Sequence, residues 1–415
     1  MMEHWQKIKL GDISEVIGGG TPSTKNYDFW NGDIPWLTPK DLSGYNFRYI
    51  SKGERNITKL GLQNSSARML PKGTVLLTSR APIGYVAIAE NEVCTNQGFK
   101  SIVLKEGYCS EFFYYLLKNN IDYIVGMASG STFAEISGTQ VKNLEFMVPP
   151  LGVQRKIAGV LGVLDDKIEL NNKINQNLEL QAQSLFKSWF VDFEPFGGTI
   201  PSDWKEIQLT EIADFIGGYS YKGAELKQST TAMATIKNFD RNGGFKLDGY
   251  KEIEPSSKLK QNQYVELFDT LVAHTDLTQN AEVIGNAEML LSKGKYKNVI
   301  ISMDVVRVVP KNGISKYLLA AILKDPHFKK HCLGYVNGTT VLHLSKRALP
   351  EYSLIFPKNV KILDNISGLF EDLYKKIALN IEENIRLSIL RDTLLPKLMS
   401  GEINVDNVEI SDGKE

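Results

Sequence analysis

The strongest constraint on this chain is that its sequence repeats itself with a period close to 200 residues. Apolar, glycine and proline positions recur in the same order, at an offset that grows from 199 to 208 residues. This period is far longer than the roughly 20–50 residues of a solenoid unit. The sequence therefore predicts two copies of one fold, related by a pseudo-twofold axis, with insertions in loops. The matched positions include residues 5–10 and 204–209, Gly18 with Gly19 and Gly217 with Gly218, and Pro149 and Pro357.

Each copy begins with a segment of mixed character, residues 1–150 in the first and 196–357 in the second. Short runs of β-branched and aromatic residues are bounded there by proline and glycine, as is typical of strands and turns. A helical pattern follows in both copies, so each segment is predicted to form an α/β (α+β) domain. The expected strands lie at 74–78, 85–89 and 101–104, and the expected helix at 111–118 recurs at 316–324.

A long helix is predicted to follow each domain, at 151–195 and at 358–403, and an acidic tail at 404–415 is expected to be disordered. Apolar residues in both helices recur in alternating steps of four and three, which is the seam of a coiled coil. Asparagines interrupt both seams at equivalent places, and buried asparagine fixes register. The seam residues are Ile157, Leu161, Leu164, Ile168, Asn171, Asn175, Leu178 and Leu185, then Ile366, Phe370, Leu373, Ile377, Asn380, Asn384, Leu387 and Leu394.

The length of these helices decides between two ways of packing them. A helix of about 35 residues is on the order of 50 Å long, more than one domain of this size can cover. The alternative is that each helix packs on its own domain. We expect instead that the two helices pack on each other, antiparallel, and separate two similar domains.

Composition excludes several classes of protein without identifying a partner. The 48 basic residues balance the 48 acidic ones, so overall charge gives no sign of nucleic-acid binding. Three scattered cysteines imply no disulfide framework. The amino-terminal residues lack the apolar core of a signal peptide, and no apolar run is long enough to span a membrane. A cytoplasmic protein is expected.

The helices carry the motifs that resemble a known family. Pro-Pro-Leu at 149–151, Gln-Arg-Lys-Ile-Ala at 154–158 and Leu-Asp-Asp-Lys-Ile-Glu-Leu-Asn at 164–171 resemble the central conserved region of Type I restriction–modification specificity subunits. Leu-Phe-Lys-Ser-Trp-Phe-Val-Asp-Phe at 185–193 closes that region, and residues 394–403 resemble the distal one. The likeness spans nearly the whole chain, with its specific motifs in the helices.

This resemblance implies a non-catalytic subunit that binds double-stranded DNA through two target-recognition domains. It implies that two methyltransferase subunits dock on the helices, and it is compatible with restriction and translocase subunits joining them. S-adenosylmethionine would be bound by the methyltransferases, so no cofactor or metal is expected on this chain. The second helix has Lys-Ile-Leu-Asp at 361–364 in place of the Gln-Arg pair, so docking is expected to be less symmetric than the fold.

Side chains that contact DNA should be amides, hydroxyls and cations presented from loops. Residues 38–80 hold eight basic residues against two acidic ones, although a solvated surface explains that excess equally well. The turns that begin at Gly130 and Gly338 would offer backbone N–H groups to phosphate. Candidate DNA-binding residues are Thr38, Lys40, Arg48, Ser79, Arg80, Asn96 and Gln97 in the first domain and Lys237, Asn238, His274, Thr275, Gln279 and Asn280 in the second.

Catalytic interpretations find little support in the sequence. The glycine-rich run at 18–25 lacks the glycine that precedes lysine in a phosphate-binding loop, and no Asn/Asp-Pro-Pro-aromatic motif of an amino-methyltransferase is present. His327, His331 and Cys332 have helical spacing but no evident fourth ligand for zinc. The alternative function is a coiled-coil scaffold whose domains bind proteins, and it would lack salt-sensitive DNA binding.

Overall fold

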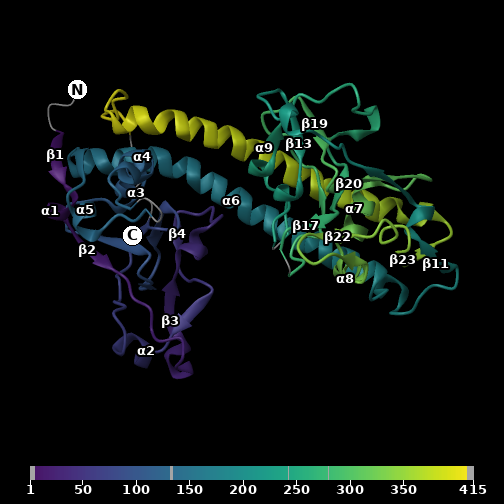
Figure 1. The fold of residues 1–415 in the computed structure, drawn as a ribbon, viewed down its shortest axis with the longest axis horizontal. Coiled ribbons are helices and arrows are strands. Elements are labelled where there is room, and N and C mark those ends of the chain that lie inside the picture. Colours follow the sequence, from purple (N-terminus) through teal and green to yellow (C-terminus); the bar gives the residue numbers. More distant parts are fainter. Residues whose placement is uncertain (1–4, 131–133, 242, 279, 409–415) are drawn as a thin grey trace. The chain divides into compact units, whose positions relative to one another are not determined.

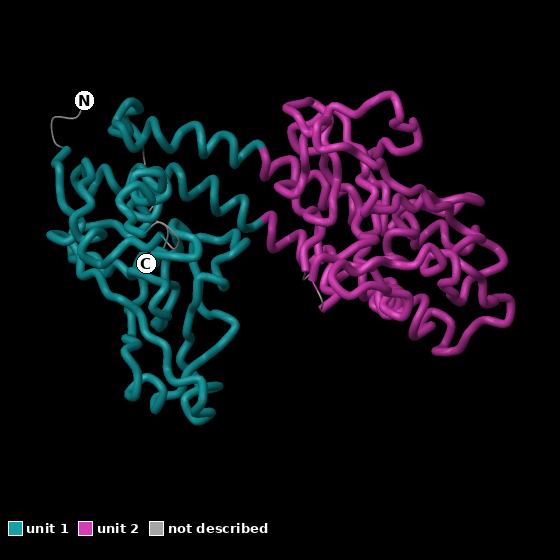
Figure 2. Tube along the Cα trace, viewed as in Figure 1, with its two compact units in different colours: residues 1–170, 386–415 teal, residues 171–385 magenta. Residues whose placement is uncertain are grey.

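The computed structural model describes residues 5–130, 134–241, 243–278 and 280–408. It contains two compact units (Figure 2). Unit 1 comprises residues 1–170 and 386–415, and unit 2 comprises residues 171–385. The helices α6 (Leu151–Phe190) and α9 (Asp364–Met399), which can be followed in Figure 1, each give one part to each unit. Unit 1 is therefore assembled from two separate stretches of chain, whereas unit 2 is one continuous stretch.

The first copy folds into a five-stranded sheet, ordered β2-β9-β6-β7-β4, and a three-stranded sheet, ordered β5-β3-β8. The strands are β1 (Gln6–Lys9), β2 (Ser14–Gly18), β3 (Trp30–Leu37), β4 (Tyr49–Ile50), β5 (Arg55–Ile57), β6 (Val75–Ser79), β7 (Ile83–Ala89), β8 (Cys94–Thr95), β9 (Phe99–Leu104) and β10 (Glu145–Val148). The helices are α1 (Leu10–Ile13), α2 (Lys59–Gln63), α3 (Ser110–Asn119), α4 (Ile121–Gly126) and α5 (Gly138–Lys142), with 3-10 turns η1 (Tyr27–Phe29) and η2 (Pro39–Leu42).

The second copy has a four-stranded sheet, β12-β20-β16-β18, and a second one, β14-β13-β19-β15. Its strands are β11 (Trp204–Gln208), β12 (Ala213–Gly217), β13 (Thr231–Ala234), β14 (Lys251–Glu252), β15 (Tyr264–Val265), β16 (Thr270–Ala273), β17 (Thr275–Asp276), β18 (Ala287–Met289), β19 (Asn298–Ile301), β20 (Val305–Pro310), β21 (Val336–Asn337), β22 (Leu342–Leu344) and β23 (Ser353–Pro357). The helices are α7 (Lys316–Lys324) and α8 (Pro326–Leu333), and the 3-10 turns are η3 (Glu194–Phe196), η4 (Leu209–Glu211), η5 (Gly223–Glu225), η6 (Ile236–Asn238), η7 (Leu247–Gly249), η8 (Gln261–Gln263) and η9 (Val360–Leu363).

The duplication predicted from sequence is present in the strand pairing. β1 pairs with β10 as β11 pairs with β23, and β2 pairs with β9 as β12 pairs with β20, all antiparallel. The parallel pair of β3 and β8 has its equivalent in β13 and β19. The two copies therefore share one α/β fold, as the repeat predicted.

The sheets β2-β9-β6-β7-β4 and β12-β20-β16-β18 are the main sheets of units 1 and 2. An inner strand of each, β6 and β16, buries both of its faces. Alternate residues of a strand point to opposite faces. Leu77 accordingly joins the core under α3 and α6, whereas Leu76 joins the core shared with the second sheet. In the second copy Val272 and Leu271 divide in the same way. The main sheet thus lies between a helical layer and a second small sheet in both units.

A glycine pair stands at the end of β2 and another at the end of β12, and one glycine of each pair lies very close to a backbone carbonyl group. A Cβ atom on Gly19 would lie 2.0 Å from the carbonyl oxygen of Asn96, and one on Gly218 would lie 1.9 Å from that of Ser302. The preceding glycines, Gly18 and Gly217, have open space at the same point. One glycine of each pair therefore lets the loop lie against the neighbouring strand.

Helices α6 and α9 run antiparallel within each unit. In unit 2 the Asn171 amide donates to Asn384 over 2.8 Å, and the Asn380 amide donates to Asn175 over 2.8 Å. In unit 1 Arg391 donates to Asp165 over 2.6 Å. Every seam position named above is buried or half-buried. Among the described residues, no helix is both long and apolar enough to cross a membrane.

The alternative packing also contributes, because the outer parts of both helices lie on the domain cores. Ile157 and Leu161 share a core with α3, and Ile366 and Phe370 share one with α7. The expectation of a disordered tail is wrong for its first part. Val405 is only 4% exposed and packs in unit 1, while residues 409–415 lie outside the described residues.

Substitution of the two close-approach glycines tests this account. We expect Gly19→Ala and Gly218→Ala each to lower the free energy of unfolding by about 1–3 kcal/mol, because the added methyl group overlaps a carbonyl oxygen. The controls Gly18→Ala and Gly217→Ala should change it by less than about 0.5 kcal/mol. Denaturant titration measures all four variants. Equal effects at both positions of a pair would contradict the structure.

Candidate nucleic-acid interface

In the first domain the strand ends bring several predicted site residues to one edge. β3 and β8 run parallel. The backbone N–H of Asn96, which follows β8, donates to the carbonyl oxygen of Leu37 at the end of β3 over 2.8 Å. The Ser79 amide at the end of β6 donates to Gly98 O over 2.7 Å. The residues gathered at this edge are Thr38, Ser79, Arg80, Asn96 and Gln97.

These side chains differ in how free they are to meet a ligand. Gln97 is exposed, and Arg80 is partly exposed, with its guanidinium 3.5 Å from Glu135. Ser79 is buried and accepts a hydrogen bond from Lys100 over 3.2 Å. Asn96 is half-buried, and its side-chain oxygen accepts from the Gly98 amide over 2.8 Å. Gln97 and Arg80 therefore face solvent most directly.

A short 3-10 turn in each copy presents a lysine beside this edge. Thr38 precedes η2 and donates its hydroxyl to Asp41 over 2.7 Å, which fixes the turn and leaves Lys40 exposed. In unit 2, η6 is closed by the Thr235 amide, which donates to Asn238 over 2.8 Å, and Lys237 is exposed. η2 follows β3 and η6 follows β13, and these two strands belong to the equivalent parallel pairs β3–β8 and β13–β19. Lys40 and Lys237 therefore occupy equivalent places.

Arg48 is placed differently from the other candidates. Its side chain is 7% exposed and forms ion pairs with Asp166 and Glu169 on α6, the latter with 3.1 Å between Nε and Oε1. Its backbone N–H donates to the same Glu169 carboxylate over 2.8 Å. Arg48 thus ties the loop before β4 to the long helix, and its guanidinium is committed to that contact.

The edge in unit 2 is built by equivalent hydrogen bonds. The His274 amide donates to Asp304 O over 2.8 Å, as Ser79 does to Gly98, and Leu344 donates to His274 O over 2.9 Å, as Ile136 does to Ser79 O over 3.1 Å. His274 therefore takes the place of Ser79. By the same pairing His343, which precedes Leu344, takes the place of Glu135.

The remaining candidates in unit 2 are divided between surface and interior. Asn280 is exposed like Lys237, His274 is half-buried, and Thr275 is 5% exposed. Asn238 is fully buried, and its amide also donates to Lys246 O over 2.7 Å, so it serves the turn. Gln279 lies outside the described residues.

An open cavity of about 360 Å³ lies beside Lys237 in unit 2. Arg241 and Lys246 also line it, each paired with an acidic residue, Glu282 at 3.0 Å and Asp240 at 3.2 Å respectively. It is bounded on its other side by Leu277 and Thr278, which follow β17. The cavity is therefore continuous with the candidate edge and mixed in charge.

Sequence reasoning missed three polar side chains at these edges, Lys100, Glu135 and His343. Lys100 lies 3.1 Å from Glu135, and both occupy the edge with Arg80. Glu135 and His343 each lie five residues after Gly130 and Gly338, which have φ values of 106° and 111°. Residues 131–133 lie outside the described residues. Their matched position, five residues after the glycine of the repeated Gly-Ser/Thr-Thr motif, is the signal that could have identified Glu135 and His343.

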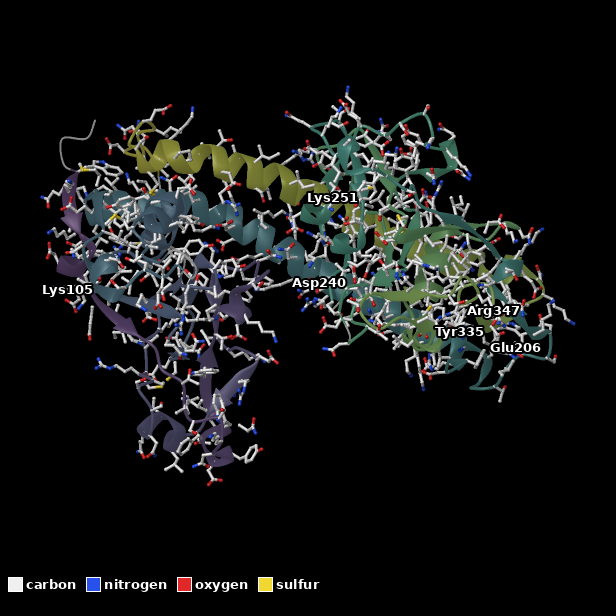
Figure 3. The ribbon with its side chains drawn as sticks, in the orientation of Figure 1. Lys105, Glu206, Asp240, Lys251, Tyr335 and Arg347 are labelled. Carbon is white, nitrogen blue, oxygen red and sulfur yellow. The ribbon has the colours of Figure 1, made fainter. Side chains whose placement is uncertain are left out.

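Charge at the unit 2 edge is set by histidines and a shared carboxylate. Burial lowers the pKa of His274, and the nearby His343 and Lys346 lower it further, so the neutral imidazole can both donate and accept a hydrogen bond. Arg347 and Tyr335, labelled together in Figure 3, both bond to Glu351, at 2.5 and 2.7 Å. Glu351 thus forms an ion pair with Arg347, whose side chain stays 75% exposed. Within the described ranges no cluster of three metal-binding side chains was found.

Comparison with known proteins gives a consistent result. The profile of the Type I restriction modification DNA specificity domain matches residues 2–180. The specificity subunit of the Type I restriction enzyme MjaIX from Methanocaldococcus jannaschii is 36% identical over 421 residues, 97% of this chain and 94% of that subunit. The HindI specificity subunit from Haemophilus influenzae is 25% identical and covers 97% of this chain and all of its own length (100%).

A solved structure is also similar in fold. The crystal structure of the Type I restriction–modification system S subunit from M. genitalium matches with a TM-score of 0.56 and 17% identity, over 95% of this chain and 96% of that one.

Replacing Arg48 distinguishes a structural role from a DNA contact. We expect Arg48→Met to lower the free energy of unfolding by about 3 kcal/mol, because it leaves the largely buried Glu169 carboxylate without its partner. Adding Glu169→Leu should recover part of this loss, and the exposed control Lys52→Met should have little effect. Thermal and denaturant unfolding measure the change. A variant that unfolds like the parent protein but loses DNA affinity would reinstate Arg48 as a DNA contact.

Proposed function

The chain belongs to the family of Type I restriction–modification DNA specificity subunits, and we propose that it reads an asymmetric, bipartite DNA target with one half-site for each unit. Members of this family confer DNA target specificity and assemble with methyltransferase subunits, and the specificity subunit is not itself an enzyme. The active sites of the complex therefore belong to its partners. We propose that those methyltransferases bind the S-adenosylmethionine.

One observation supports two half-sites above all others. The turns η2 and η6 present Lys40 and Lys237 at equivalent places, next to equivalent strand ends. A lysine beside such strand ends can pair with a DNA phosphate and fix the register of the duplex, while neighbouring polar side chains contact the bases. Two such edges in one chain suit two short half-sites.

The two edges carry different side chains, which supports an asymmetric target. Where the first has Ser79 and Glu135, the second has His274 and His343. A carboxylate accepts hydrogen bonds, for instance from a cytosine amino group, whereas a neutral imidazole can donate or accept. Equivalent positions of the two edges are therefore proposed to favour different bases.

Assembly is proposed to use the two long helices. We expect one methyltransferase subunit at each end of the α6–α9 pair, with restriction subunits able to join. Exposed apolar side chains on these helices, such as Val163 and Leu379, which are 67% and 63% exposed, fit such contacts. The turn after Gly338 is proposed to add backbone donors to a phosphate, whereas residues 131–133, which follow Gly130, lie outside the described residues.

The lysines of η2 and η6 provide the direct test. Lys40→Ala and Lys237→Ala should each weaken binding to every duplex and lower the slope of log affinity against log salt concentration by about 1. Lys105→Ala and Lys311→Ala are matched controls. Lys105 follows the last residue of β9 and Lys311 follows the last residue of β20, whereas the first residues of both strands lie next to the proposed DNA edges. Fluorescence anisotropy at several salt concentrations measures the slopes. No salt-dependent binding by the assembled complex would favour the protein-binding scaffold.

Helix length should set the distance between half-sites. Seven residues inserted after Leu170 in α6 and seven after Ile385 in α9 keep the heptad register and add about 10 Å to each helix. We expect the preferred spacer to lengthen by about three base pairs, at roughly 3.4 Å each. Selection of bound duplexes from a library of spacer lengths measures it. A seven-residue insertion beside Gly197, outside the helices, is the control, and an unchanged spacer in the helix variant would contradict the proposal.

A further inference from the structure

A largely apolar cavity of about 310 Å³ opens in unit 2, and none of the candidate DNA-binding residues lines it. It lies between α6, the junction of α7 and α8, and one residue of α9. Its inner walls include side chains that are almost fully buried, while Gln183 and Ser184 on its rim are exposed. Its lining includes Ala182, Phe186, Ala321, Lys324 and Tyr374.

The same place in unit 1 is filled by the chain itself. The long helices correspond at an offset of 209, which matches Ala182 with Arg391 and Tyr374 with Asp165. Helices α3 and α7 begin at Ser110 and Lys316, an offset of 206 that matches Ala321 with Tyr115. The cavity is therefore one copy of a duplicated site.

In unit 1 three side chains close that site. The Tyr115 hydroxyl donates to one oxygen of Asp165 over 2.6 Å, and Arg391 donates to the other over 2.6 Å. Tyr115 is fully buried, and the carboxylate has two charge-assisted or polar partners. In unit 2 Ala321 and Ala182 replace Tyr115 and Arg391, the buried Tyr374 stands in the place of Asp165, and a cavity remains between these three residues.

We propose that the unit 2 cavity receives a tyrosine side chain from a docked methyltransferase subunit. This rests on the proposed function, which places a methyltransferase on α6 and α9. The occupant is inferred from the filled copy, where this site holds a tyrosine ring. Phe186 and Tyr374 provide aromatic walls for such a ring.

The polar side of the cavity suits the hydroxyl of that tyrosine. Lys324 is held by Glu288 at 2.8 Å and by Glu179 at 3.4 Å, and the Glu179 side chain is 30% exposed. Glu179 lines the cavity and has oxygen lone pairs to accept from a phenol, as Asp165 does in unit 1. A desolvated aromatic anchor inside a polar rim is the usual form of a binding hot spot.

The two units would then differ in what they offer a methyltransferase subunit. Among the described residues, Tyr115 and Arg391 occupy in unit 1 the place of the alanines that line the unit 2 cavity. Two identical methyltransferase subunits would then bind with different affinities, the tighter one at unit 2.

Ala321→Tyr tests the proposal by giving unit 2 the residue that unit 1 carries. We expect the unfolding midpoint of the purified variant to equal that of the parent subunit. The variant should still bind one methyltransferase normally, and its affinity for the second should fall about thirtyfold or more. Ala182→Leu fills the cavity from the opposite wall and should do the same, whereas Ala321→Ser should behave like the parent chain. Native mass spectrometry and titration with the purified methyltransferase measure stoichiometry and affinity.

A competing phenol provides a second readout. p-Cresol should weaken methyltransferase binding to the parent subunit and leave binding to Ala321→Tyr unchanged. If Ala321→Tyr and Ala182→Leu both bind two methyltransferases like the parent chain, the proposed role of the cavity is wrong and the proposed function is unaffected. If the parent chain binds no methyltransferase, both the proposed function and the proposed role of the cavity are wrong.

Discussion

The hydrogen bonds between α6 and α9 are the contacts on which both units depend. Each unit is completed by a part of the long helix from the other copy, because residues 386–415 belong to unit 1 and residues 171–190 to unit 2. Asp165 with Arg391 in one unit and the asparagine pairs in the other fix the register of that exchange. Buried polar pairs cost more to break than apolar contacts, so few other registers are open to the helices.

The fold then determines where recognition is possible. Parallel pairs β3–β8 and β13–β19 deliver strand ends to one edge of each unit, and the close-approach glycines let a loop lie against it. The backbone of that edge is held by the same hydrogen bonds in both copies, whereas its side chains differ. A fixed frame with variable side chains is what a pair of specificity domains requires, since new bases can be read without rebuilding the core.

The sequence predicted the features that are local or repeated. The heptad seam and the asparagines at 171 and 380 follow from spacing alone, and the strands at 74–78 and 101–104 follow from composition and turns. The burial of Arg48 did not follow, because its partner Glu169 lies 121 residues away. Asn238 has the composition of a base reader, yet it closes a turn, and only the fold distinguishes the two. The cavity near Ala321 was equally invisible, since its walls come from α6, α7, α8 and α9, which are far apart in the sequence.

The most direct test is the methylation pattern that this subunit directs. The chain would be produced with its methyltransferase, and host DNA would be sequenced for N6-methyladenine by single-molecule kinetics. The account predicts one asymmetric bipartite motif with a fixed spacer, in which exchange of residues 196–357 for another recognition domain alters one half only. Absence of any methylated motif, together with absence of salt-dependent DNA binding by the complex, would contradict it.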